Sequence, residues 1–176
     1  LTDHAFWLGI NAADLFLESR MVGASNSVYE RGITADKIRM LDCCLYISQD
    51  EVSIPLPFDI QTEKYIFSGG FLYKTLGDER LLYYKIVRFI LKNYPDIKFL
   101  YAGSGDETEM KKIISEFPNQ AYLIAERADF FRLIENCIFY LNTYPMFGGL
   151  MMRYAAIANK IPVTLKHNSD HEGILL

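Results

Sequence analysis

The sequence contains little cysteine, no cluster of positive charge and no long apolar run. Its three cysteines are Cys43, Cys44 and Cys137, a spacing that fits neither a disulfide framework nor a zinc site. We therefore expect small buried cysteines in a reducing compartment and no structural metal. The net charge of −4, with Lys111-Lys112 as the densest basic pair, argues against a nucleic-acid partner.

The lack of a long apolar run bears on location. No uninterrupted run approaches the roughly 18 residues that a membrane-spanning helix needs, and we expect a cytoplasmic protein. Apolar residues make up 51% of the chain and charged residues 23%, which is typical of a globular protein. The residues after Leu1 read as the interior of a domain, so we expect the chain to be a piece of a longer protein.

From residue 65 onward, short apolar runs alternate with segments of helical periodicity. The runs are 65–68, 97–102, 121–124, 137–141 and 161–165, short enough for strands buried on both faces of a parallel sheet. The expected helices are 79–94, one that opens at Asp106, 128–135 and 149–159. Asp78 is a candidate N-cap of the first, and Asp106 with Glu109 has the spacing of a capping box. This alternation predicts an α/β fold with a doubly wound parallel sheet of the Rossmann-like type.

The first 62 residues have a different character. A strand is expected at 13–18, a helix at 22–31 and a short strand at 37–41, followed by an irregular stretch with Pro55 and Pro57. Such a stretch between two regular regions is a linker candidate, and we place the domain boundary near Gln61. Residues 1–62 would then be the end of one domain and a linker, and residues 63–176 a nucleotide-binding domain.

Ligands of an open parallel sheet bind outside the carboxyl ends of its strands. The candidate residues that follow the expected strands at that edge are Gly69, Gly70 and Lys74, then Gly103, then Glu126 and Arg127, and finally Tyr144, Gly148, Gly149 and Leu150. Gly148 and Gly149 lead directly into an expected helix, whose first amides and dipole would attract a diphosphate. The alternative is that these glycines only make a turn. A second glycine pair at the same edge, with Lys74 nearby, favours the binding site.

The other candidates are less specific. Gly103 belongs to a G-x-G that lacks the third glycine of a dinucleotide fingerprint, so we expect a turn beneath the nucleotide there. Glu126 and Arg127 either hold a base or ribose or form a solvated surface pair. His4 is a candidate catalytic residue because histidine titrates near neutrality, although an isolated histidine more often has a structural role.

These loops, in this order, resemble the C-terminal domain of GT-B glycosyltransferases, particularly the bacterial enzymes that build surface polysaccharides. The resemblance covers residues 65–165 and is carried by YIFSGGFLYK, FLYAGSGDETEMKK, AERADFFRLIENCIFYLNTYP and FGGLMMRYAAIANKIPVTL. The segments DHAFWLG, ADLFLESR and SVYERGITADKIRML resemble the last part of the N-terminal, acceptor-binding domain of the same enzymes. The chain is therefore expected to form the C-terminal half of a GT-B architecture.

The resemblance implies a glycosyltransferase, most simply a hexosyltransferase, that moves a sugar from a nucleotide sugar to a polysaccharide, glycolipid or protein acceptor. A UDP-sugar is the expected donor. Family pattern places Gly69, Gly70 and Lys74 near the donor phosphates, the Glu126–Arg127 loop near the base, and Gly148, Gly149 and Leu150 at the diphosphate. No metal cofactor is implied, because a helix dipole and basic side chains stabilise the departing diphosphate. A glycan or lipid-linked acceptor is compatible with peripheral membrane association of the full-length protein.

Two departures limit what the resemblance carries over. Many relatives have a pair of glutamates around the last glycine loop, where this chain has Met146 and Tyr154, and an arginine where it has Gly70. The contacts to sugar and ribose are therefore not transferred. Two alternatives stay open, a sugar-nucleotide epimerase of the same architecture and a non-catalytic module that binds a nucleotide sugar. The chain alone is expected to bind nucleotide without transferring sugar.

Overall fold

A computed structural model describes residues 12–42, 45–48 and 55–166. Contacts between Cα atoms divide the chain into two units, the second of which spans Ile47–Asn168. Within residues 12–42, strands β1 (Phe16–Glu18) and β2 (Ile38–Met40) pair in parallel, with helix α1 (Met21–Tyr29) between them in sequence. This strand–helix–strand order is the one predicted for the first part of the chain.

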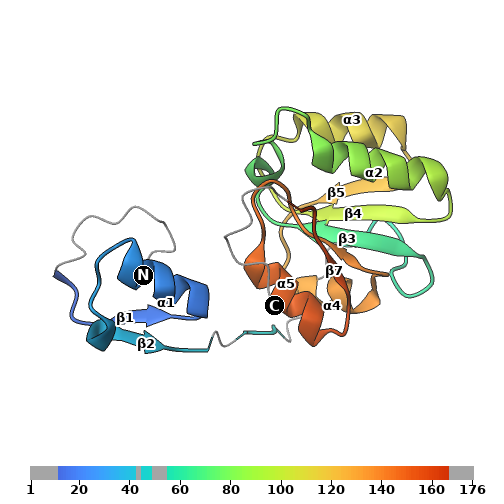
Figure 1. The fold of residues 1–176 in the computed structure, drawn as a ribbon. Helices are drawn as coiled ribbons and strands as arrows, with labels where there is room; N and C mark the ends of the chain where they lie inside the picture. Colours follow the sequence, from blue (N-terminus) through green and yellow to red (C-terminus); the bar gives the residue numbers. More distant parts are fainter. Residues whose placement is uncertain (1–11, 43–44, 49–54, 167–176) are drawn as a thin grey trace. The chain divides into compact units, whose positions relative to one another are not determined.

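The second unit is built around a five-stranded parallel sheet (Figure 1). Its strands are β3 (Tyr65–Gly69), β4 (Lys98–Ala102), β5 (Ala121–Ile124), β6 (Tyr140–Leu141) and β7 (Pro162–Val163). They lie in the order β5-β4-β3-β6-β7, so the chain first moves from β3 toward one edge and then returns to the other side of β3. The reversal between β3 and β6 is a topological switch point, where sheets of this class bind their ligands.

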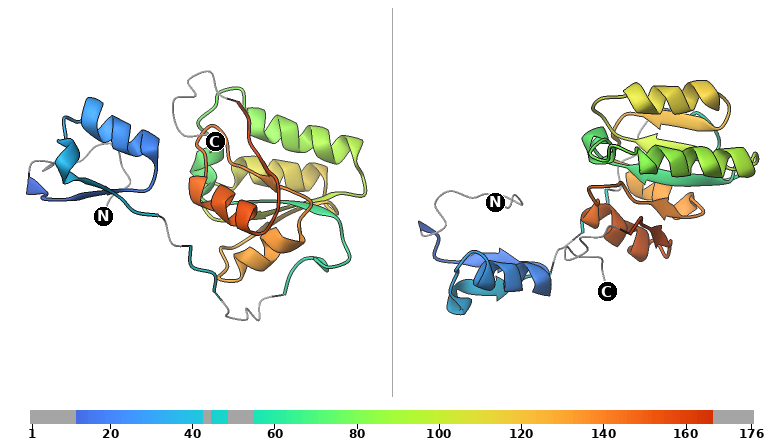
Figure 2. Two further views of the ribbon diagram at one scale, coloured as in Figure 1. Left: turned by 60° about the horizontal axis from the view of Figure 1, so that its bottom comes forward. Right: turned by 45° about the horizontal axis from the view of Figure 1, so that its top comes forward.

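Helices cover both faces of this sheet, as predicted. Helices α2 (Leu82–Asn93) and α3 (Thr108–Glu116) lie on one face, and α4 (Phe130–Asn136) and α5 (Gly149–Ile157) lie on the other (Figures 1 and 2). Covering both faces explains why every residue of β3 is buried. The doubly wound α/β prediction is therefore confirmed.

The core beside the sheet is rich in tyrosine. The side chains of Tyr65, Tyr83, Tyr84, Tyr101 and Tyr140 are all fully buried. Four of these hydroxyls have partners: Tyr65 donates to Leu133 O at 2.6 Å, Tyr83 to Ser68 Oγ at 2.7 Å and Tyr140 to Gly69 O at 3.4 Å, and Tyr84 pairs with Thr75 at 2.7 Å. The Tyr101 hydroxyl is buried with no partner in the described part of the chain. Burial raises the pKa of each of these tyrosines, which therefore stay neutral at physiological pH.

The helix starts differ from the predictions in detail. Helix α2 begins at Leu82, three residues later than expected, although Asp78 does accept a hydrogen bond from Leu82 N at 2.8 Å. The predicted capping box at the start of α3 is wrong. Asp106 Oδ1 accepts from the backbone N and hydroxyl of Thr108, at 3.0 and 2.6 Å, two residues along the chain. Asp106 therefore bonds locally to Thr108 in an Asx-type turn and does not make the capping-box bond with Glu109.

Candidate functional site

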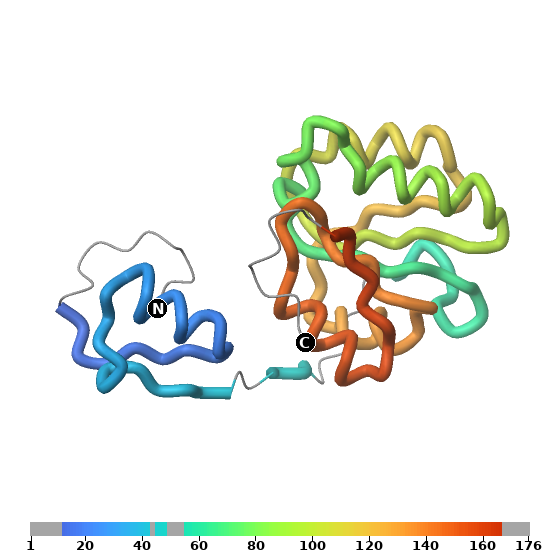
Figure 3. Tube along the Cα trace, viewed as in Figure 1, coloured from blue at the N-terminus to red at the C-terminus, as the bar shows by residue number. Residues whose placement is uncertain are grey.

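Most of the predicted site residues follow the carboxyl ends of β3, β4, β5 and β6, where the connecting loops form one continuous rim. Three hydrogen bonds join neighbouring loops: Met146 N donates to Lys74 O at 3.2 Å, Leu72 N to Ser104 O at 2.8 Å, and Ser104 Oγ to Glu126 Oε1 at 2.8 Å. The short 3-10 helix η3 (Leu72–Thr75) therefore lies between the loop after β6 and the loop after β4 (Figure 3). We call this set of loops the rim.

On the β3 and β4 side of the rim, glycine is required by the close approach of two backbones. Gly70 has a φ of +124°, and its N donates to Ala102 O at 3.0 Å. A Cβ added to Gly103 would lie 1.9 Å from Gly70 O, and one added to Gly69 would lie 2.9 Å from Ala102 O. These glycines allow the loops to touch, which is a structural requirement independent of any ligand.

The loop after β6 is organised by Asn142, a residue that the sequence analysis missed. Its buried Oδ1 accepts hydrogen bonds from Thr143 N at 3.0 Å and Gly148 N at 2.9 Å. Its Nδ2 donates to the sulfur of Met152 on α5 at 2.8 Å. One side chain thus fixes both ends of the loop and the start of the helix. An asparagine at the end of a strand and just before a glycine loop is the available sequence signal.

The first turn of α5 presents backbone N–H groups without partners. The first helical bond runs from Met152 N to Gly148 O, at 3.1 Å, and the amides of Gly149, Leu150 and Met151 have no acceptor in the described part of the chain. Gly149 is exposed, its φ is not positive, and a Cβ added there would meet no atom within 4 Å. Open amides at the positive end of a helix dipole form a ready site for an anion.

Lys74 is a basic residue of η3 whose backbone lies beside the loop after β6. Its backbone is held on both sides, because its N donates to Phe71 O at 3.1 Å and its O accepts from Met146 N. The side chain is half-buried, and among residues 12–42, 45–48 and 55–166 it forms neither an ion pair nor a hydrogen bond. Within those ranges, no partner neutralises the Lys74 charge.

The side chains of Glu126 and Arg127 bond to different partners. The Arg127 side chain is only 4% exposed and its Nε and Nη2 donate to the two carboxylate oxygens of Asp129, at 2.7 and 2.8 Å. This pairing lowers the pKa of Asp129 and ties Arg127 to the residue before α4. Glu126 is exposed and accepts from Ser104. The two side chains do not form the solvated pair considered from the sequence, and a role for either at a ligand stays a prediction.

The two positions where the resemblance to GT-B enzymes would place glutamates hold a methionine and a tyrosine. Met146 is 50% exposed on the loop after β6. Tyr154 on α5 is 6% exposed and packs edge-on against Phe130 of α4, with ring centroids 4.8 Å apart and planes at 83°. Tyr154 thus joins the two helices on that face of the sheet.

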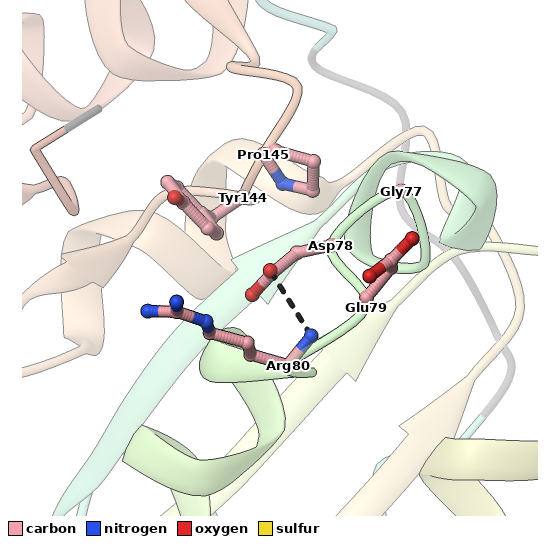
Figure 4. Close-up of a pocket in the computed structure, with 6 residues that line it drawn as sticks. All are labelled: Gly77, Asp78, Glu79, Arg80, Tyr144 and Pro145. Atoms are coloured by element: carbon pink, nitrogen blue, oxygen red, sulfur yellow. Dashed lines mark hydrogen bonds between the residues drawn. The ribbon is translucent and has the colours of Figure 1, made fainter. Parts of the chain in front are cut away.

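Tyr144 and Leu150 complete the predicted set on this loop. Tyr144 is 8% exposed and precedes a cis peptide bond to Pro145, whereas Leu150 is 51% exposed in the first turn of α5. Tyr144 and Pro145 line a pocket of about 350 Å³ with residues 77–80 (Figure 4). Asp78 in that pocket accepts from Arg80 N at 3.1 Å and from Leu82 N, so its carboxylate is committed to the start of α2.

His4, the candidate catalytic residue, lies outside the described residues. Within the described ranges, no group of three or more His, Cys, Asp or Glu side chains could hold a metal ion. The same ranges contain no helix long and apolar enough to cross a membrane.

No protein-family model matches the sequence, and no curated protein sequence matches it. Solved structures are similar in fold. S. aureus TarM, solved with Fondaparinux, alpha-GlcNAc-glycerol and UDP, aligns with a TM-score of 0.63 at 15% identity over 89% of this chain and 30% of its own. The pneumococcal O-GlcNAc transferase GtfA, in complex with UDP and GlcNAc, gives 0.59 at 16% identity over 89% of this chain and 31% of its own. A putative UDP-N-acetylglucosamine 2-epimerase from Listeria monocytogenes aligns with a TM-score of 0.59 at 13% identity, over 92% of this chain and 44% of its own.

These likenesses show the fold. The chain has the arrangement of the C-terminal domain of GT-B enzymes, as its loop order predicted. It spans less than half the length of each of these proteins.

Proposed function

We propose that this chain provides the donor-binding half of a GT-B glycosyltransferase, which transfers a sugar from a UDP-sugar to a glycan or lipid-linked acceptor. The observation that carries the proposal is the start of α5 at the switch point of the sheet, where the amides of Gly149, Leu150 and Met151 have no partner among the described residues. A diphosphate is the ligand that this arrangement suits, since several amides and a helix dipole point at one place.

The same groups suit the chemistry of transfer. The bond between the sugar C1 and the β-phosphate oxygen breaks and its electron pair stays on that oxygen. The acceptor oxygen bonds to C1 and releases its proton to solvent. Negative charge therefore grows on the leaving diphosphate. The amides of α5 and the Lys74 ammonium would stabilise that charge without a metal ion. Support also comes from the fold, because TarM and GtfA were both solved with UDP. Metal independence, a hexose as the transferred sugar, a cytoplasmic location and membrane contact of the intact protein stay predictions.

A second candidate function is epimerisation of a UDP-sugar. It is favoured by the fold likeness to the putative UDP-N-acetylglucosamine 2-epimerase from Listeria monocytogenes. A third is binding without catalysis, because Met146 and Tyr154 replace the glutamates of many relatives. Product analysis of the full-length protein with UDP-, GDP- and CDP-sugars separates the three. Transfer, epimerised sugar nucleotide and unchanged donor are the respective outcomes.

The direct test of the donor site is calorimetry on this chain with UDP, GDP, CDP and uridine. We expect UDP to bind in the micromolar to millimolar range, which corresponds to about 4–8 kcal/mol. Lys74→Ala should weaken UDP binding more than uridine binding, because a charge-assisted contact to phosphate is lost. Lys85→Ala is the control, since Lys85 is an exposed lysine on α2. Equal losses for UDP and uridine, or no binding of any nucleoside diphosphate, would contradict the proposal.

A further inference from the structure

Two aromatic side chains stand exposed side by side on the rim. Phe71 is 51% exposed and Tyr73 is 55% exposed, and their rings stack with centroids 6.1 Å apart and planes at 21°. Large aromatic side chains normally contribute to a protein by being buried. A stacked pair that keeps its ring surface in water is therefore a candidate contact surface.

The backbone holds this pair rigidly. Leu72, between the two rings, is fully buried and its N donates to Ser104 O. Thr75 Oγ1 donates to Leu72 O at 2.7 Å. A Cβ added to Gly105 would lie 3.3 Å from Leu72 Cβ, which shows how closely the next loop packs against η3. Because the segment is already ordered, a ligand that contacts the rings would lose little additional conformational freedom on binding.

The pair also adjoins the proposed donor site. Phe71 directly follows Gly70, and Lys74, which follows Tyr73, is bonded through its carbonyl to the loop that leads into α5. The amides and the lysine of the rim suit a charged ligand, whereas the exposed ring surface suits an uncharged one. Aromatic faces pack well against flat apolar surfaces, including the C–H face of a sugar ring.

We infer that Phe71 and Tyr73 form a platform for a pyranose ring of the acceptor glycan. This inference rests on the proposed function, because it takes the neighbouring amides and Lys74 as the donor site. The platform would orient one sugar of the acceptor next to the donor phosphates. Its specificity would be for ring shape, since aromatic faces do not read the pattern of hydroxyl groups.

The test is a ¹H–¹⁵N NMR titration of this chain with chitotriose and with maltotriose, each with and without UDP. The variants are the double substitution Phe71→Ala with Tyr73→Ala and the double substitution Phe71→Leu with Tyr73→Leu. Leucine keeps apolar bulk but lacks the aromatic face. Phe89→Ala is the matched control, because Phe89 is a 64% exposed aromatic residue on α2. Thermal unfolding checks that each variant is folded.

We expect at least one trisaccharide to shift the amide signals of residues 71–74. The alanine and leucine variants should bind it about fivefold more weakly, and the Phe89 control should bind it unchanged. UDP affinity should be the same in all of them.

Three results would overturn the inference. Parallel loss of UDP binding in the variants would show that the rings stack on the nucleobase. Absence of any trisaccharide shift at residues 71–74, while UDP still binds, would refute the platform and leave the donor site standing. If neither UDP nor trisaccharide binds, the proposed function fails and the platform fails with it.

Discussion

The loop after β4 and the loop after β6 both depend on glycine, for opposite physical reasons. A Cβ at Gly103 would collide with Gly70 O at 1.9 Å, whereas one at Gly149 would meet nothing within 4 Å. The first glycine is required because two pieces of the protein occupy the space beside it. The second has empty space beside it, and the amides around it have no partner in the part of the chain that the structure describes.

The two sides of the rim differ in the same way beyond these glycines. After β4 and β5 the polar groups satisfy one another, as Ser104 does with Glu126 and Arg127 with Asp129. After β6 the start of α5 is held by Asn142 but its first amides stay open. The comparison teaches that a glycine loop indicates a ligand only where its backbone groups and its space are both left free.

The largest expected effect is that of Gly103→Ala on stability. The new methyl group cannot fit beside the Gly70 carbonyl without moving one of two backbones, so we expect a loss of about 3 kcal/mol in the free energy of unfolding. Urea unfolding followed by circular dichroism measures it. A Gly103→Ala protein as stable as the parent would show that the loops separate easily and would break the contrast with Gly149.

Asp129→Asn tests the ion pair between Asp129 and Arg127, which lies on the side of the rim where the polar groups bond to one another. The Asp129–Arg127 pair is nearly buried, so we expect a loss of about 2 kcal/mol at neutral pH. Because Arg127 lowers the pKa of Asp129, its stabilisation is present above the unfolded pKa of about 3.9 and disappears as the pH falls through the lower folded value. The difference between parent and variant should therefore shrink below about pH 4.

Glu116→Gln supplies the matched control for that experiment. Glu116 pairs with Arg88 at 2.8 Å, but its side chain is 45% exposed. Exposed pairs contribute little, so we expect a change below about 1 kcal/mol. A loss as large as that of Asp129→Asn would indicate that burial does not distinguish the two pairs.

Gly149→Ala tests the open side. We expect UDP affinity to fall at least about tenfold, or some 1.4 kcal/mol, because the methyl group occupies the space where the diphosphate would lie. Stability should stay the same or rise by up to about 1 kcal/mol, since the φ of Gly149 is not positive and alanine favours helix. Calorimetry and urea unfolding measure the two quantities separately. Undiminished UDP affinity in a folded variant would remove the main local argument for the diphosphate site.

Tyr101→Phe is expected to change the free energy of unfolding least. It tests whether an unpartnered polar group indicates a ligand site when that group is buried. The Tyr101 hydroxyl, like the α5 amides, is unpartnered within the described residues, but it is fully buried and no ligand reaches it. Removing it should raise the free energy of unfolding by about 1 kcal/mol. Tyr83→Phe is the control and should lower it by a similar amount, because Tyr83 donates to Ser68 Oγ. Destabilisation by Tyr101→Phe would mean that the hydroxyl has a partner after all, such as a buried water.

The strands were predicted well because their signal is local. In the five-stranded sheet, β4, β6 and β7 lie within predicted apolar runs, the run at 121–124 coincides with β5, and β3 extends one residue beyond its predicted run, to Gly69. The helix starts were predicted less well, because the end of a helix depends on which groups compete for its first amides. The sequence spacing at Asp106 allowed a capping box, but the nearer N–H and hydroxyl of Thr108 donate to its carboxylate instead.

The meeting of these loops at one edge of the sheet was predictable for a topological reason. Once the sheet is parallel, residues that follow its strands must meet at one edge, and the hydrogen bonds of Lys74, Ser104 and Glu126 show that they do. What each residue does there was not predictable. Arg127 has the same side chain whether it faces a ribose or an aspartate two residues along, and only the fold brings its guanidinium against Asp129.

The sequence by itself therefore determined the order of strands and helices, the parallel sheet and the edge at which its loops meet, because apolar periodicity and glycine positions are written along the chain. Only the tertiary structure decided in which of those loops the polar groups bond to one another and in which the backbone amides have no partner among the described residues. That distinction depends on distances between residues far apart in sequence: 1.9 Å from a Gly103 Cβ to Gly70 O, and more than 4 Å of free space at Gly149. No pattern in either loop encodes what lies across from it.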